Sequence, residues 1–163
     1  MFLAVLLASL SLHIYPSEID SLLRELDMSI RNRPQYTLKR QEQIDALQRK
    51  LRLSHSDQER YDLYRELFGK YRSYRMDSAL WVANQRVELA KRMKNPLYIR
   101  SAELNIAEVM IGVAMYKEGL EILDGIKSAD LDASGVSYYY YQYHQVYTLM
   151  ADYAFSDQMK EHY

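Results

Sequence analysis

A set of apolar positions recurs three times along the chain, in segments where apolar residues follow the three-to-four-residue spacing of an amphipathic helix. The copies lie about forty residues apart, a period typical of stacked helix pairs, because one pair cannot bury its own apolar face and packs against the next. The pattern therefore predicts an all-α fold, an α-solenoid of stacked antiparallel helix pairs. The recurring positions are Leu67, Phe68 and Tyr71, then Ile106, Ala107 and Met110, and then Val146, Tyr147 and Met150.

Residues that satisfy the free amides of a first helical turn mark where the helices begin. Ser17 and Ser56 are each followed three positions later by an acidic residue, which is the capping-box pattern. Asn95 precedes a proline and Asp77 follows a short turn, so both are expected helix caps. The predicted helices cover 17–31, 36–53, 57–74, 77–94, 96–113, 116–127 and 136–153, with a loop over 128–135 and an eighth helix from about 156.

Paired in order, these helices form three hairpins and the start of a fourth. The repeat domain is therefore expected over 17–163 and is expected to continue in the natural protein, because a solenoid needs a polar closing face. Apolar stripes on the helices define the predicted core. The stripes are Leu22, Leu23, Leu26 and Ile30 on the first helix, Ile44, Leu47 and Leu51 on the second, and Ala79, Val82, Ala83, Val87 and Ala90 on the fourth.

The N-terminal segment has a different composition. Residues 2–12 form an uncharged apolar run, which is the length of a signal-peptide core and is too short to span a bilayer. We expect residues 1–11 to be a signal peptide, with cleavage after Ser11 and without a basic segment before Phe2. The protein would then be exported. A buried N-terminal helix is the alternative.

Composition and charge narrow the function classes. The formal net charge of -1 offers no general attraction to nucleic acid, so none is expected to contact this fragment. Seven Lys or Arg residues gather between Arg31 and Arg52, which indicates either a solvated basic helix face or a docking surface. Cysteine is absent, the four histidines lack ligand spacing, and no phosphate-binding loop is present. We therefore predict a non-catalytic protein without a metal site or a cofactor.

The repeating unit resembles the tetratricopeptide repeat, and the middle copy resembles it most. Glycine stands at Gly119 where that family usually has alanine, and Ala114 stands where glycine is usual. The first copy matches from Tyr61 to Pro96, and the third copy matches in its first helix only. In the middle copy the matching positions are Ile106, Ala107 and Met110, then Ala114 and Tyr116, and then Gly119, Leu123 and Ile126.

A narrower resemblance covers nearly the whole chain. The apolar leader, the segments EIDSLLRELDMSIRNRPQYTLKRQEQIDALQRKL and YRMDSALWVANQRVELAKRMKNP, and the tyrosine-rich helix ending at Tyr153 are similar to the extracytoplasmic sensor region of uncharacterised bacterial membrane-anchored helix-turn-helix regulators. This resemblance implies a sensor that binds an unknown protein, peptide or other ligand. It also implies a location in the periplasm or on the extracytoplasmic face of a bacterial inner membrane. Membrane tethering and DNA binding would belong to sequence beyond Tyr163. A freestanding periplasmic scaffold that mediates protein–protein interactions is the alternative.

The resemblance also places candidate ligand-binding residues on the first helix of each pair, which would line a groove. Arg65 and Arg72 suit a carboxylate, and Tyr141 and His144 offer aromatic surface with a polar tip. Glu108 is the candidate in the middle copy. The same residues are also consistent with an ordinary solenoid surface whose ligand binds elsewhere. Further candidates are Asp62, Ser101, Leu104, Ile111 and Thr148.

Half of the sixteen tyrosines lie from Tyr138 onward. On a helix Tyr139, Tyr143 and Tyr147 share one face, and Tyr141, like its neighbour Tyr140, points away from that face. We expect the first three to pack between helices. The second pair is expected at the surface, where exposed aromatic clusters often contact partners.

Overall fold

The computed structural model describes residues 16–153, and every regular element in that range is a helix. The elements are α2 (Pro16–Arg31), α3 (Arg33–Leu53), α4 (Asp57–Tyr71), α5 (Met76–Arg92), α6 (Pro96–Gly112), α7 (Tyr116–Asp124), the short 3-10 helix η1 (Ser128–Asp130) and α8 (Ala133–Asp152). This confirms the all-α prediction, with helix ends within about three residues of those expected. The predicted signal peptide over 1–11 and the predicted eighth helix lie outside the described residues.

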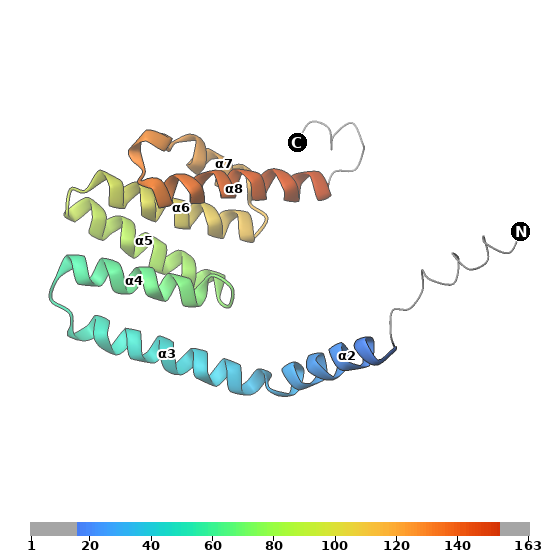
Figure 1. The fold of residues 1–163 in the computed structure, drawn as a ribbon. Helices are drawn as coiled ribbons and strands as arrows, with labels where there is room; N and C mark the ends of the chain where they lie inside the picture. Colours follow the sequence, from blue (N-terminus) through green and yellow to red (C-terminus); the bar gives the residue numbers. More distant parts are fainter. Residues whose placement is uncertain (1–15, 154–163) are drawn as a thin grey trace, which may run out of the picture. The chain divides into compact units, whose positions relative to one another are not determined.

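The chain divides into two compact units, residues 1–43 and residues 44–163. In the first unit, α2 leads into the start of α3 through Asn32 alone (Figure 1). Asn32 N donates to Met28 O at 2.9 Å, and Tyr36 N donates to Asn32 O at 3.1 Å. Because these are helical i to i+4 bonds on both sides of the junction, the chain does not reverse there. The predicted hairpin of helices 17–31 and 36–53 is therefore wrong.

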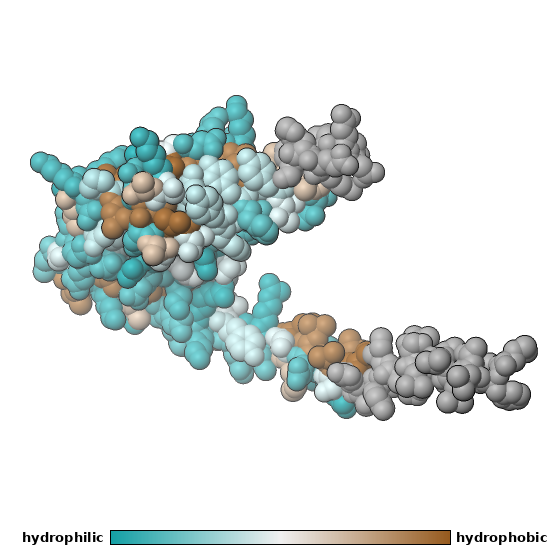
Figure 2. All heavy atoms as spheres, turned by 45° about the horizontal axis from the view of Figure 1, so that its top comes forward, coloured by the Kyte–Doolittle hydropathy of each residue, from teal (hydrophilic) through white to brown (hydrophobic). Residues whose placement is uncertain are grey.

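The apolar stripe on α2 was predicted to be core, and this prediction is also wrong. Its three leucines and its isoleucine lie at the surface, with Leu22 61% and Ile30 60% exposed (Figure 2). The hairpin partner that would have covered them does not form, because Pro34 fits the first turn of α3 and leaves no loop between the helices. The other exposed members of the stripe are Leu23 and Leu26.

The second unit stacks α4, α5, α6, α7 and α8 side by side (Figure 1). The pairs α4 and α5, and α6 and α7, form the predicted antiparallel hairpins, and α8 packs on both α6 and α7. The buried residues of α3 join the same core through Ile44 and Leu47, which confirms the predicted stripe on that helix. The alanine-rich stripe of α5 is buried too, with Ala79, Ala83 and Ala90 at 0% exposure. Small side chains there let α5 approach the helices on both sides closely.

The central helix α6 contributes to two buried clusters. Ala102 and Val109 pack with α4 and α5, whereas Ala107 and Ile111 pack with α7 and α8. A helix that is apolar on two faces is buried between neighbours, which is why α6 holds the two halves of the unit together. The predicted repeat position Tyr147 is an exception to the recurring burial. It is 39% exposed, since in the described part of the chain no later helix covers that face of α8.

Local signals in the sequence account for the start of α4 and the start of α6. Ser56 Oγ accepts a hydrogen bond from Glu59 N at 3.4 Å, and Asn95 Oδ1 accepts one from Tyr98 N at 3.2 Å, so both predicted caps are confirmed. Asp77 is not a cap, because α5 begins at Met76 and its cap position is Arg75. Helix α2 already begins at Pro16, so Ser17 lies inside its first turn.

The turn between α6 and α7 shows why the tetratricopeptide repeat usually has glycine where this chain has Ala114. Ala114 adopts a φ of +62°, in the left-handed region where a side chain crowds the backbone. Glycine tolerates this conformation without a steric cost, which is the physical reason for glycine at this position in the repeat.

Candidate functional site

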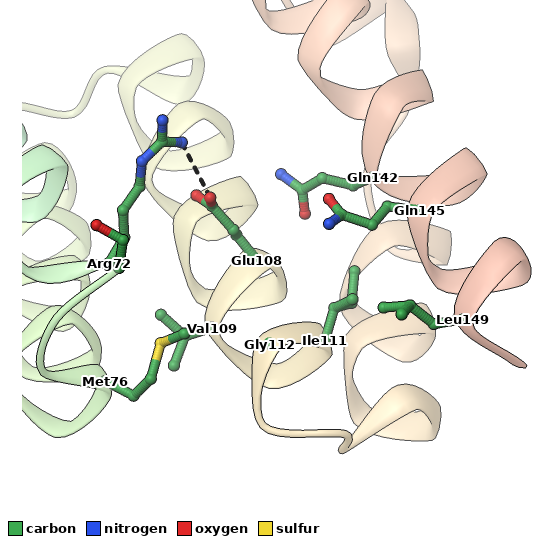
Figure 3. Close-up of a pocket in the computed structure, with 10 residues that line it drawn as sticks. Arg72, Met76, Glu108, Val109, Ile111, Gly112, Gln142, Gln145 and Leu149 are labelled. Carbon is green, nitrogen blue, oxygen red and sulfur yellow. Dashed lines mark hydrogen bonds and ion pairs between the residues drawn. The ribbon is translucent and has the colours of Figure 1, made fainter. Parts of the chain in front are cut away.

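A pocket of about 280 Å³ opens between the end of α4, the first residue of α5, α6 and α8, and we call it the groove pocket (Figure 3). Figure 3 shows Arg72, Glu108 and two glutamines around one end, and apolar side chains from α5, α6 and α8 around the other. The pocket is therefore amphipathic. Its lining residues are Arg72, Ser73, Met76, Glu108, Val109, Ile111, Gly112, Gln142, Gln145 and Leu149.

The polar end is held by a hydrogen-bonded network centred on Glu108. Arg72 Nη1 donates to Glu108 Oε1 at 2.9 Å, and the Tyr138 hydroxyl donates to Glu108 Oε2. Asn105 Nδ2 donates to the Tyr138 oxygen at 3.5 Å. Burial raises the pKa of Tyr138 strongly, and the charge of Glu108 and its hydrogen bond raise that pKa further. Tyr138 is therefore a neutral donor that orients the Glu108 carboxylate.

The opposite wall carries an amide with an unused acceptor. Gln142 is 1% exposed, and its Nε2 donates to Leu104 O at 2.9 Å. Its Oε1 has no hydrogen-bond partner among the described residues. Figure 3 shows Gln142 and Gln145 extending from α8 toward the α6 side of the pocket. A buried acceptor without a partner is costly, so a ligand that donates a hydrogen bond here would be favoured.

A second pocket, of about 310 Å³, lies next to the first and shares Arg72 with it. We call it the arginine pocket, because three guanidinium groups line it. Arg86 contributes from α5, where it is 2% exposed. Its lining residues are Arg65, Phe68, Gly69, Arg72, Arg86, Ser101, Leu104, Asn105, Asp132, Ser134, Gly135 and Tyr138.

The sequence candidates are only partly brought together. Arg65 lies at the arginine pocket, Glu108 at the groove pocket, and Arg72 at both. Tyr141 is 55% exposed and His144 is also exposed, and neither lines the groove pocket or the arginine pocket. Of the further candidates, Ser101 and Leu104 line the arginine pocket and Ile111 lines the groove pocket. Asp62 and Thr148 line neither.

On α8, the face that lines the pockets is not the face predicted from the sequence. From Tyr138 onward, the side chains of α8 that reach the pockets are Tyr138, Gln142, Gln145 and Leu149, at i, i+4, i+7 and i+11. This spacing is present in the sequence, but the prediction placed the groove on the face that carries Tyr141 and His144. Tyr139, Tyr143 and Tyr147 share one face of α8 as predicted, with ring centroids 5.0 Å apart for Tyr139 and Tyr143 and 6.2 Å apart for Tyr143 and Tyr147. The expectation that all three pack between helices is wrong for Tyr147, which is 39% exposed.

Arg86 was also missed by sequence reasoning. It stands within the alanine-rich stripe of α5, four residues after Val82, and a charged residue in an otherwise apolar stripe is an available signal. Among residues 16–153 no group of three or more His, Asp or Glu side chains is placed to hold a metal ion. In the same range no helix is both long enough and apolar enough to cross a membrane.

The stacked antiparallel hairpins and the pockets along their first helices define an α-solenoid of the tetratricopeptide-like, helical-repeat class of binding modules. The chain belongs to the SusR N-terminal TPR domain family, whose profile matches residues 30–163. No curated protein and no solved structure matches the chain at a significant level. The family assignment confirms the resemblance to the tetratricopeptide repeat.

Proposed function

We propose that this chain is the non-catalytic sensor domain of a membrane-anchored bacterial transcriptional regulator, and that it binds a peptide or a similar ligand in the groove pocket. Membership of a TPR domain family supports a binding role, since helical-repeat domains present extended surfaces to partners. The single observation that carries the assignment to this pocket is the unpartnered Gln142 Oε1, buried close to an apolar wall.

The chemistry of the groove pocket favours a ligand that donates hydrogen bonds. The Glu108 carboxylate and the Gln142 carbonyl oxygen are acceptors, and Val109, Ile111 and Leu149 supply apolar surface. A peptide with an apolar side chain next to a lysine, arginine or amide group fits this combination. Arg72, which lines both pockets, is already hydrogen-bonded to Glu108.

Selection from a random-peptide display library, followed by calorimetry with the selected peptides, tests the assignment. Glu108→Gln is expected to weaken binding about tenfold or more, since a hydrogen bond to a charged group contributes about 1.5–3 kcal/mol. Gln145→Ala is expected to weaken binding less, since a hydrogen bond to a neutral amide contributes about 0.5–1.5 kcal/mol. Glu88→Gln is the matched control, because Glu88 is an exposed carboxylate on α5 that lines neither of the two pockets. Peptides that bind all three variants equally well would contradict the assignment.

The regulator role makes a separate prediction about the gene. Its reading frame is expected to continue past Tyr163 into a membrane helix and a helix-turn-helix segment. A frame that encodes neither would favour the freestanding periplasmic scaffold instead. Export is tested by N-terminal sequencing of the mature protein, which we expect to begin after Ser11. Recovery of Met1 as the first residue would contradict export by cleavage.

A further inference from the structure

Arg86 is a buried cation held by neutral groups. Its Nη1 donates to Asn105 Oδ1, and its Cζ lies 4.4 Å from the ring centroid of Tyr61. The Tyr61 ring in turn stacks on Tyr98 with centroids 4.6 Å apart. Arg86 Nε has no hydrogen-bond partner among the described residues. A guanidinium in this setting has lost its water without gaining a full set of acceptors.

Burial of an ionised group without a counter-charge is expensive, and it shifts the pKa of the group in the direction that favours the neutral form. Burial lowers the pKa of Arg86, the neighbouring Tyr61 raises it in part, and the Arg65 charge lowers it again. The Asp62 carboxylate raises it, but Asp62 is also 3.5 Å from Arg65 and is shared with that residue. The Arg86 site therefore favours an additional negative charge.

The arginine pocket gives a ligand access to this site. Arg65 and Arg86 line it from α4 and α5, and the hydroxyl-bearing residues Ser101 and Ser134 line it from α6 and α8. Guanidinium groups bind carboxylates through paired N–H donors, and the unused Nε–H of Arg86 is such a donor.

The charge around the pocket favours a monoanion. Asp132 lines the pocket, and hydrogen bonds from Gly135 N and the Ser134 hydroxyl lower its pKa, so it is ionised. Glu108 already neutralises Arg72. These two carboxylates repel a doubly charged phosphate more strongly than a singly charged carboxylate.

We propose that the arginine pocket is a carboxylate-binding site in which Arg86 and Arg65 hold the ligand's carboxylate group. Apart from Arg72, the site has its own lining, and Arg86 is its own buried anchor, so it does not depend on the peptide proposed for the groove pocket or on the regulator role. The ligand class is a small organic acid or the carboxylate of a larger molecule, and both present the same group to the pocket.

Thermal unfolding of the purified protein with N-acetylglycine tests the proposal, and N-acetylglycinamide serves as the uncharged match. At equal ionic strength, N-acetylglycine is expected to raise the Tm by about 3 °C or more at tenfold excess over its Kd, and the amide is expected to leave it unchanged. Arg65→Gln should at least halve this rise. Arg92→Gln should leave it intact, because Arg92 is an exposed arginine that is ion-paired to Asp57 and lines neither of the two pockets.

A spectroscopic readout identifies the anchor directly. In a proton–nitrogen spectrum, the Nε–H resonance of Arg86 is expected to shift on addition of N-acetylglycine, and it can be assigned by its loss in Arg86→Gln. If Arg86→Gln does not fold, the comparison of Arg65→Gln with the unchanged protein still tests whether the arginine pocket binds the carboxylate.

Three outcomes would each overturn the proposal: equal effects of the acid and the amide on the Tm, an equal or larger effect of inorganic phosphate, or an undiminished rise of the Tm in Arg65→Gln. Titration of acetate against N-acetylglycine then separates recognition of the bare carboxylate from recognition of the attached amide.

Discussion

Arg72 Nη1 donates a hydrogen bond to Glu108 Oε1 at 2.9 Å, which joins the end of α4 to α6 across 36 residues of chain. The side chains are 49% and 25% exposed, so solvent screens the pair. Its position matters more than its strength, because Arg72 lines both pockets and Glu108 also accepts a hydrogen bond from Tyr138 on α8. One carboxylate thus ties the first helices of three successive repeats together.

A double-mutant cycle on this pair measures the coupling. We expect Arg72→Gln and Glu108→Gln to show an interaction energy of about 0.5–1 kcal/mol in urea denaturation, typical of a partly exposed ion pair. The exposed pair Lys91 and Glu88, 3.0 Å apart on α5, is the control and should give less. A coupling energy near zero for Arg72 and Glu108 would show that the pair does not form in solution.

The strained turn at Ala114 predicts a stabilising substitution. Replacing Ala114 with glycine removes the crowding of its side chain at φ +62°, and we expect the free energy of unfolding to rise by about 0.5–1 kcal/mol. Ala46→Gly inside α3 is the control and should lower the free energy by a similar amount. Thermal denaturation of both variants checks whether each change raises or lowers the stability. A loss of stability in Ala114→Gly would contradict the assigned turn conformation.

Two helical glycines predict opposite effects of the same change. A Cβ at Gly69 meets no atom within 4 Å, so Gly69→Ala should stabilise the protein by about 0.5–1 kcal/mol through helix propensity. A Cβ at Gly119 would lie 2.8 Å from Cγ1 of buried Ile111, close to the backbone where the side chain cannot move away. Gly119→Ala should therefore destabilise by about 1–3 kcal/mol. Chemical denaturation of the two variants side by side checks the contrast.

The exposed stripe of α2 predicts an unusual tolerance of leucine truncation. Leu26 is 55% exposed, so Leu26→Ala should cost less than about 1 kcal/mol, whereas Leu104→Ala, at 1% exposure, should cost about 2–5 kcal/mol. Urea denaturation measures both. Equal costs would show that the α2 stripe is covered when the protein is in solution.

The raised pKa of Tyr138 predicts a loss of stability in alkali. Above its ordinary pKa of 10.0 the unfolded chain releases a phenolic proton that the folded chain keeps, so the free energy of unfolding falls as pH rises. Below about pH 10 the contribution is fully present. Tyr138→Phe should make the decline shallower by up to about 1.4 kcal/mol per pH unit, and the exposed Tyr140→Phe should not change it as much. Denaturation midpoints across the alkaline range check this, and equal slopes would contradict the buried position of Tyr138.

Helix positions and the fold class followed from local signals. Capping residues such as Ser56 and Asn95, and the three-to-four-residue spacing of apolar positions, act within one or two turns, so they can be recognised without a partner helix. The forty-residue period added the stacking of hairpins, since each repeat needs its neighbour to bury its apolar face. Two of the predicted hairpins, and the shared helix face of Tyr139, Tyr143 and Tyr147, are confirmed on this basis.

Tertiary structure alone decided which faces meet. The stripe on α2 is as regular as the one on α5, yet only the second is buried, because a single residue between α2 and α3 leaves no room for a hairpin. On α8 the contact with α6 turned Gln142 inward and left Tyr141 and His144 outside the pockets. The burial of Arg86 needed Tyr61 from α4 and Asn105 from α6 on either side of it. Such contacts join residues that are distant in the chain, so their geometry depends on how the helices rotate and pack and is not encoded in any one segment.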